Sequence, residues 1–202
     1  VKDDVNKDDM VKESVIKAIH DVSKDDVAKA DVSKNDVSKD GVAKADVPKD
    51  SNNNNELSKS ISMYHNGLVY EFGPPEKLDL FLATYCYREA ARLGHTAAQC
   101  RLGRLFELGM GVDQNIVTAI KWYRAAMEKG DVLARYYLGM CYLRGKGVTQ
   151  NTKKGMRYIK KAADSELDLA QCYMAYSYFF GEGVDRNESF ALQYATQAAS
   201  RG

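Results

Sequence analysis

Apolar positions in the second half of the chain follow a helical spacing that restarts every 36 residues. The first such set is Leu102, Leu105 and Phe106, whose side chains fall three or four positions apart on one face of a helix. A second helical set follows in the same period and includes Trp122 and Tyr123. The pattern therefore predicts a pair of helices in each period of 36 residues.

A Gly-x-Gly-Val turn and a polar helix start separate the two helices of each pair. The first glycine suits the left-handed residue that ends a helix, because it has no side chain to clash there. An asparagine stands at the start of the second helix of each pair. It suits an N-cap, because its short side chain accepts hydrogen bonds from the backbone amides that open that helix. The expected turn and cap residues are Gly109, Gly111, Asn115, Gly145, Gly147, Asn151, Gly181, Gly183 and Asn187.

A weaker copy of the unit precedes these three. Shifting the sequence by 36 residues places Gly67, Gly73 and Asp79 at the positions of a helix glycine, the first turn glycine and the cap. In this copy Pro74-Pro75-Glu76 replaces Met-Gly-Val, so we expect a different loop. The predicted units are residues 58–94, 95–130, 131–166 and 167–202.

Residues 1–56 follow neither structural period. Valines recur every five residues from Val22 to Val47, a spacing that scatters them around a helix and over both faces of a strand. The 13 tyrosines, 6 phenylalanines and Trp122 all follow this segment, which carries 10 lysines and 14 acidic residues. We expect a disordered, low-complexity linker before a folded domain at residues 57–202. A multivalent ligand for another protein is the alternative interpretation of the identical pentads.

The run from Ala98 to Gly130 resembles the Sel-1-like repeat, a relative of the tetratricopeptide repeat. The period of 36 and the Gly109-x-Gly111-Val112 turn carry the resemblance, since the plain tetratricopeptide unit has about 34 residues and lacks this turn. The resemblance implies an all-α fold, a right-handed α-solenoid of about four helix-turn-helix repeats. It also implies that the first helices line a concave surface, which holds extended peptides or partner domains.

Positions that vary between units along the first helices mark the expected binding surface. Arginine and tyrosine anchor many protein interfaces, because they combine contact area with hydrogen-bond donors. For any single tyrosine, packing between adjacent hairpins explains its position equally well. The predicted contact residues are His65, Arg101, Arg104, Arg135, Tyr137, Tyr173 and Tyr176.

Residues that could carry catalysis are scattered. His20, His65 and His95 have no repeated carboxylate partner, and Cys86 and Cys141 fall at core positions, where a thiol is inert. The four cysteines lack the short paired spacing of a zinc site or a disulfide framework. We therefore expect no catalytic residue, no metal site and no cofactor.

Overall charge and chain ends restrict partners only coarsely. The 29 basic and 28 acidic residues exclude strong whole-chain attraction to nucleic acid or membrane, and no apolar run approaches the roughly 20 residues that span a bilayer. The chain begins with Val1 rather than Met, so we expect a piece of a longer protein, with further repeats or domains beyond Gly202. The cysteine usage favours a cytoplasmic location.

Two functions from different classes remain open. The first is a non-enzymatic adaptor or scaffold that binds a protein or peptide partner through the concave surface, in signalling or complex assembly. The second is the regulatory repeat region of a larger enzyme, or an activator subunit of a membrane or cell-wall enzyme. Binding of an oligosaccharide through the aromatic residues is a third possibility.

Overall fold

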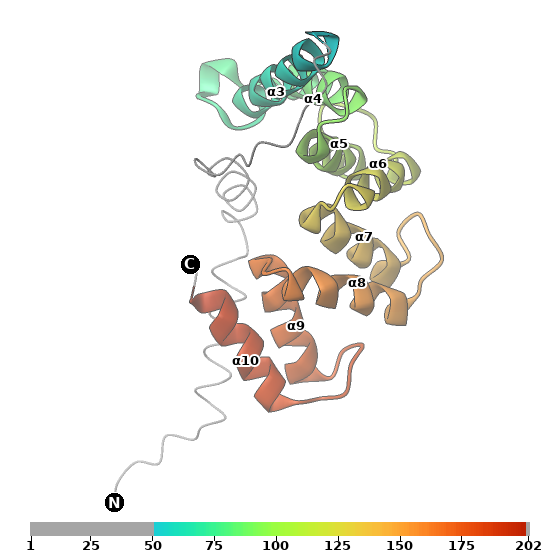
Figure 1. Cartoon of the computed structure of the whole chain (residues 1–202). Coiled ribbons are helices and arrows are strands. Elements are labelled where there is room, and N and C mark those ends of the chain that lie inside the picture. The colour runs from blue at the N-terminus through green and yellow to red at the C-terminus, as the bar shows by residue number, and fades with distance from the viewer. Residues whose placement is uncertain (1–50, 201–202) are drawn as a thin grey trace, which may run out of the picture. The chain divides into compact units, whose positions relative to one another are not determined.

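A computed structural model describes residues 51–200 of the chain (Figure 1). These residues form eight α-helices and one short 3-10 helix, and no strand. The α-helices are α3 (Ser51–Phe72), α4 (Leu80–Arg92), α5 (Thr96–Leu108), α6 (Ile116–Glu128), α7 (Val132–Arg144), α8 (Thr152–Asp164), α9 (Asp168–Phe180) and α10 (Glu188–Ala199). The expectation of an all-α fold is confirmed for this part of the chain.

The helices fall into two compact units. Of the described residues, the first unit contains 51–150 and the second contains 151–200. In the 51–150 unit, each helix from α3 to α6 packs against the next one along the chain. In the 151–200 unit, α9 packs against both α8 and α10.

The core of the 51–150 unit depends on tyrosines that lie against glycines. The Tyr87 and Tyr123 rings are fully buried. A Cβ on Gly67 would meet the Tyr87 ring at 2.5 Å, and one on Gly103 would meet the Tyr123 ring at 2.7 Å. Each glycine therefore lets two helices approach closely enough to bury a whole aromatic side chain, which contributes about 1.5–3 kcal/mol.

The core of the 151–200 unit uses smaller side chains at the corresponding positions. Ala175 on α9 and Ala195 on α10 are buried together, with Tyr194 packed against them. Ile159 on α8 and Met174 on α9 are also buried. Alanine facing alanine replaces glycine facing tyrosine here, so the close approach of the helices needs no large ring to fill it.

Turns and caps follow the local chemistry of glycine and asparagine. Gly109 ends α5 with a left-handed φ of 71°, and Gly181 ends α9 with a φ of 75°. The Asn115 side chain accepts the Thr118 backbone amide at 2.9 Å, and Asn187 accepts that of Phe190 at 3.0 Å. The other predicted turn and cap residues behave likewise: Gly111, Gly145, Gly147 and Gly183 have positive φ, and Asn151 caps α8.

The first repeat departs from the other three at its loop and at its start. The residues Pro75–Lys77 form a 3-10 helix where the others have the Gly-x-Gly turn. Helix α3 begins at Ser51, so the expected domain boundary at residue 57 lies inside a helix. The boundary itself stays a prediction. The expected disorder of residues 1–50 lies outside the described residues.

A matched pair of glycine substitutions separates packing from backbone conformation. A Cβ on Gly111 would collide with the backbone carbonyl of Leu80, whereas a Cβ on Gly130 would meet nothing within 4 Å. Both glycines have positive φ, of 66° and 94°. We expect Gly130→Ala to cost about 1 kcal/mol of unfolding free energy and Gly111→Ala about 2 kcal/mol more. Urea unfolding followed by circular dichroism measures both, and equal losses would contradict the predicted close packing.

Candidate protein-binding surface

A half-buried carboxylate, that of Glu71, joins α3, α4 and α5 in the 51–150 unit. Glu71 Oε2 accepts a hydrogen bond from the Tyr87 hydroxyl at 2.6 Å and lies 3.2 Å from Arg101 Nη1. The Arg101 and Glu71 side chains are 6% and 11% exposed, and the Arg101 guanidinium lies 4.9 Å from the centre of the Phe72 ring. These contacts make Arg101 part of the interior.

The next repeat contains the same arrangement around Glu107. Glu107 Oε2 accepts the Tyr123 hydroxyl at 2.7 Å, and Lys146 Nζ lies 3.8 Å from Oε1. Here the nearest arginine is Arg104, whose Nη1 lies 3.8 Å from Glu107 Oε2. Its side chain is 30% exposed, so this carboxylate orients an arginine that solvent can reach.

Arg104 also covers an aromatic ring. Its guanidinium carbon lies 4.7 Å from the centre of the Tyr137 ring, within the distance of a cation–π contact. Tyr137 stacks in turn on Tyr123, with ring centres 5.4 Å apart. The arginine is therefore held in place by a ring below it and a carboxylate beside it.

Burial revises the predicted contact residues of the 51–150 unit. Arg101 is 5% exposed and Tyr137 is 6% exposed, so neither presents its side chain to a partner. Both lie at helix positions that face a neighbouring helix, where Glu71 holds Arg101 and the Arg104 guanidinium covers the Tyr137 ring.

Three contact residues predicted in this unit remain accessible. His65 is exposed on α3, and its Nδ1 lies 2.9 Å from the Ile61 carbonyl oxygen. Arg104 on α5 and Arg135 on α7 are partly exposed. We name these three residues the basic set. Their role as contact residues stays a prediction.

The predicted contact residues of the 151–200 unit form an aromatic row along α9. Tyr173 and Tyr176 are partly exposed, with ring centres 6.4 Å apart. The row continues to Phe180, whose ring centre lies 4.7 Å from that of Tyr176. The Tyr176 hydroxyl donates to Glu182 at 3.2 Å, which orients its ring.

Sequence reasoning missed the two carboxylates and an exposed aromatic pair. Glu71 and Glu107 are 36 residues apart, as are their partners Tyr87 and Tyr123, so the repeat comparison contained the signal. Phe81 and Tyr85, one turn apart on α4, are 76% and 56% exposed. The repeat comparison contained this signal too, because the 36-residue shift places Tyr85 at the position of Lys121, Arg157 and Gln193.

The positions of the cysteines agree with unreactive thiols. Cys86, Cys100, Cys141 and Cys172 are all buried. Burial raises the pKa of Cys141 and of Cys172 to about 11, and it also raises the pKa of Cys86 above its usual value. Because the thiolate is the reactive form, these three groups are poor nucleophiles near neutral pH.

Residues 51–200 contain neither a metal-binding cluster nor a membrane-spanning helix. No group of three or more His, Cys, Asp or Glu side chains lies close enough together to hold a metal ion in this part of the chain. None of the helices α3 to α10 combines the length and the apolar character needed to cross a membrane.

Comparison with known families accounts for the repeated architecture. A family model described as the Sel1 repeat matches residues 56–95, 96–131, 132–166 and 168–202. The chain belongs to the Sel1 repeat family. Sel1 repeat proteins are generally protein-interaction scaffolds and typically non-catalytic.

Solved Sel1 repeat structures have the same fold. The chain is 30% identical to a protective antigen of uropathogenic Escherichia coli strains that displays an SLR fold, with a TM-score of 0.63 over 76% of this chain and 34% of that one. It is 29% identical to a Sel1 repeat protein from Oxalobacter formigenes, with a TM-score of 0.64 over 71% and 58% of the two chains. No curated protein matches. The expected α-solenoid of Sel1-like repeats is confirmed.

The buried tyrosines predict how stability of this Sel1 repeat protein falls in alkali. Burial raises the pKa of Tyr87 and Tyr123 far above the usual value, and the Glu71 and Glu107 carboxylates raise it further. Above about pH 10 the unfolded chain loses these protons while the folded chain keeps them, so stability decreases as pH rises. Each tyrosine contributes up to about 1.4 kcal/mol per pH unit to that slope.

Urea unfolding between pH 8 and 11 tests this linkage. We expect the double variant Tyr87→Phe, Tyr123→Phe to lose about 1–3 kcal/mol at pH 8, because two hydrogen bonds disappear. Its stability should then fall less steeply with pH than that of the unaltered protein. The control is Tyr85→Phe, since Tyr85 is exposed. Identical slopes in the double variant and the unaltered protein would contradict the assigned burial.

Proposed function

We propose that this Sel1 repeat protein is a non-enzymatic scaffold that binds a protein partner through the basic set on α3, α5 and α7. The observation that carries the proposal is the state of Arg104. Its guanidinium is held over Tyr137 and beside Glu107 while 30% of the side chain faces solvent.

Such an arginine suits a binding hot spot. A flexible surface arginine loses side-chain entropy when a partner immobilises it, whereas an arginine already held by a ring and a carboxylate loses less. Arginines near the centre of an interface often carry a large share of the binding energy. The preorganised guanidinium can donate to carboxylates or backbone carbonyls of a partner.

The charge of the surface favours an acidic or carbonyl-rich partner segment. Arg104 and Arg135 both present guanidinium groups, which have donors and no acceptor. Lys146, 47% exposed beside Glu107, adds a third positive group. Arg104 and Lys146 stand against the single Glu107 carboxylate, from which each lies 3.8 Å, so an incoming carboxylate gains net attraction.

The proposal predicts that Arg104→Ala reduces partner capture about tenfold or more, the effect expected of a binding hot spot. The full chain serves as bait, and captured proteins are compared between variants by quantitative mass spectrometry. The control is Arg92→Ala, because Arg92 is 70% exposed and pairs only with Glu89 in its own helix, at 3.3 Å. Loss of capture by the Arg104 variant is measured only for proteins that both the unaltered protein and the Arg92 variant capture.

Circular dichroism checks that Arg104→Ala keeps its helical content. A capture profile of the Arg104 variant equal to that of the unaltered protein would overturn the assignment of the surface. Equal loss in both arginine variants would also overturn it, because the effect would then come from overall charge and not from the oriented guanidinium.

A further inference from the structure

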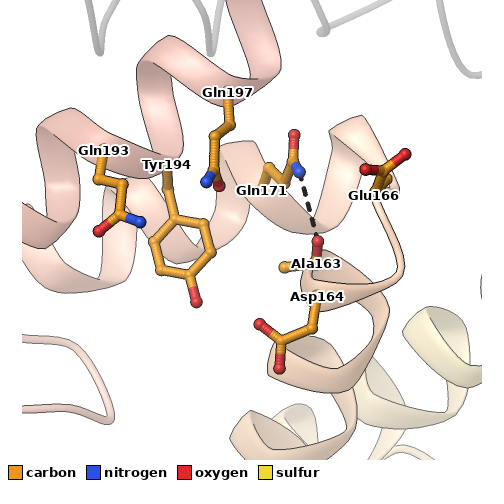
Figure 2. A pocket seen from close by; sticks show the side chains of 7 residues that line it. All are labelled: Ala163, Asp164, Glu166, Gln171, Gln193, Tyr194 and Gln197. Carbon is orange, nitrogen blue, oxygen red and sulfur yellow. Dashed lines mark hydrogen bonds between the residues drawn. The ribbon is translucent and has the colours of Figure 1, made fainter.

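A pocket of about 290 Å³ opens in the 151–200 unit between the end of α8 and helix α10. Asp164 and Glu166 line it from the end of α8 and the turn that follows, and Gln171 lines it from α9. Gln193, Tyr194 and Gln197 line it from α10 (Figure 2). Polar side chains therefore surround the pocket, and two of them are carboxylates.

Gln171 brings a buried acceptor to the pocket. This residue is 3% exposed, and its Nε2 donates to the Ala163 carbonyl at 3.3 Å (Figure 2). Its Oε1 is buried and has no hydrogen-bond partner among the described residues. A buried polar atom without a partner costs about 1–3 kcal/mol, and Gln99 Oε1 at the corresponding position of the 51–150 unit is in the same state.

The backbone at Glu166 is unusual. Glu166 has a φ of 65° and is the one non-glycine residue with positive φ among residues 51–200. The corresponding residues of the two preceding repeats are Gly94 and Gly130, with φ of 90° and 94°. A side chain in this conformation costs roughly 1–2 kcal/mol. The third repeat thus carries a carboxylate at a position where glycine would be more stable.

The pocket is lined by two carboxylates, those of Asp164 and Glu166. Helix α8 ends at Asp164, so its last carbonyls add the partial negative charge of a helix C-terminus to the Asp164 and Glu166 carboxylates. The pKa of Tyr194 is raised above its usual value, first by burial and then by the Asp164 carboxylate. The Tyr194 hydroxyl therefore stays protonated beside Asp164, and its oxygen offers lone pairs.

The corresponding place in the 51–150 unit has the same frame and the opposite charge. Gln99 Nε2 donates to the Ala91 carbonyl at 3.1 Å, as Gln171 does to that of Ala163. The positions of Asp164, Glu166 and Gln193 are taken there by Arg92, Gly94 and Lys121, and a cation already sits at that turn. Lys129 Nζ donates to the Gly94 carbonyl at 2.8 Å.

We infer that the pocket of the 151–200 unit binds the guanidinium group of an arginine side chain presented by another protein. A guanidinium has five donors in one plane and no acceptor, which suits two carboxylates and the Gln171 carbonyl. The Tyr194 ring and the glutamines give a flat group surfaces to lie against. This site goes beyond the proposed function, because it requires neither Arg104 nor the rest of the basic set.

The test uses the full chain and two small peptides as probes. Acetyl-Gly-Arg-Gly-amide carries the guanidinium, and the same peptide with citrulline replaces it by a neutral group of similar shape. We expect the arginine peptide to shift the backbone amide NMR signals of residues 163–171 and 193–197 with a dissociation constant of about 1–10 mM. Equal shifts with the citrulline peptide, or none with the arginine peptide, would overturn the inference.

Two variants separate binding from folding. Glu166→Gly should weaken the arginine peptide about tenfold while the thermal midpoint stays equal or rises, because glycine relieves the left-handed backbone. The control Asp185→Asn removes an exposed carboxylate from the same unit and should leave the affinity unchanged. Unchanged affinity in the Glu166 variant, or equal loss in both variants, would contradict the assigned pocket.

A final comparison addresses a guanidinium of the chain itself. Arg201 stands 72 residues after Lys129 and so occupies the same repeat position. The titration is therefore repeated with Arg201→Ala. Binding of the arginine peptide, but not of the citrulline peptide, to the unaltered protein supports the inference. Binding that appears only in the Arg201→Ala variant would assign the pocket to the chain's own guanidinium and overturn it. Absence of binding to both proteins overturns it.

Discussion

The close approach of two helices at a small residue is the constraint on which the repeats depend. Gly67 and Gly103 leave room for a tyrosine ring from the following helix, and the ring fills the space that the missing Cβ leaves. A side chain at either glycine would meet that ring at 2.5–2.7 Å. Because protein interiors are close-packed, the small and the large residue of each pair must change together.

That coupling reaches beyond the core. Where the pair is glycine and tyrosine, the tyrosine hydroxyl meets Glu71 or Glu107, and the carboxylate then holds or orients an arginine. In the last repeat the pair is Ala175 and Ala195, and Phe179 stands at the position of the two glutamates. Without a hydroxyl to satisfy it, a half-buried carboxylate at that position would be costly. The choice of core pair therefore decides whether a repeat can position a surface arginine.

The fold could be predicted from the sequence because its determinants are local. A glycine that must adopt positive φ and an asparagine that caps a helix act within a few residues of themselves, so their recurrence every 36 residues fixes the turns. The site could be predicted only in part. Arg101 and Arg104 look alike in the sequence, and what separates them is Glu71, 30 residues before Arg101 and on a different helix. Helical phase says which side chains share a face, but it does not say what lies opposite them.

Comparison between repeats recovers part of what helical phase leaves out. Two repeats share a glutamine amide, since Gln99 and Gln171 each donate to a carbonyl of the preceding helix, whereas Arg135 occupies this position in the repeat between them. A residue that differs from its equivalents in the other repeats indicates a property that the shared fold does not require. Glu166 at a glycine position is such a residue, because it costs backbone energy that glycine would avoid. Its carboxylate lines a pocket that also contains a buried, unpartnered acceptor, so the cost falls where a bound cation could offset it.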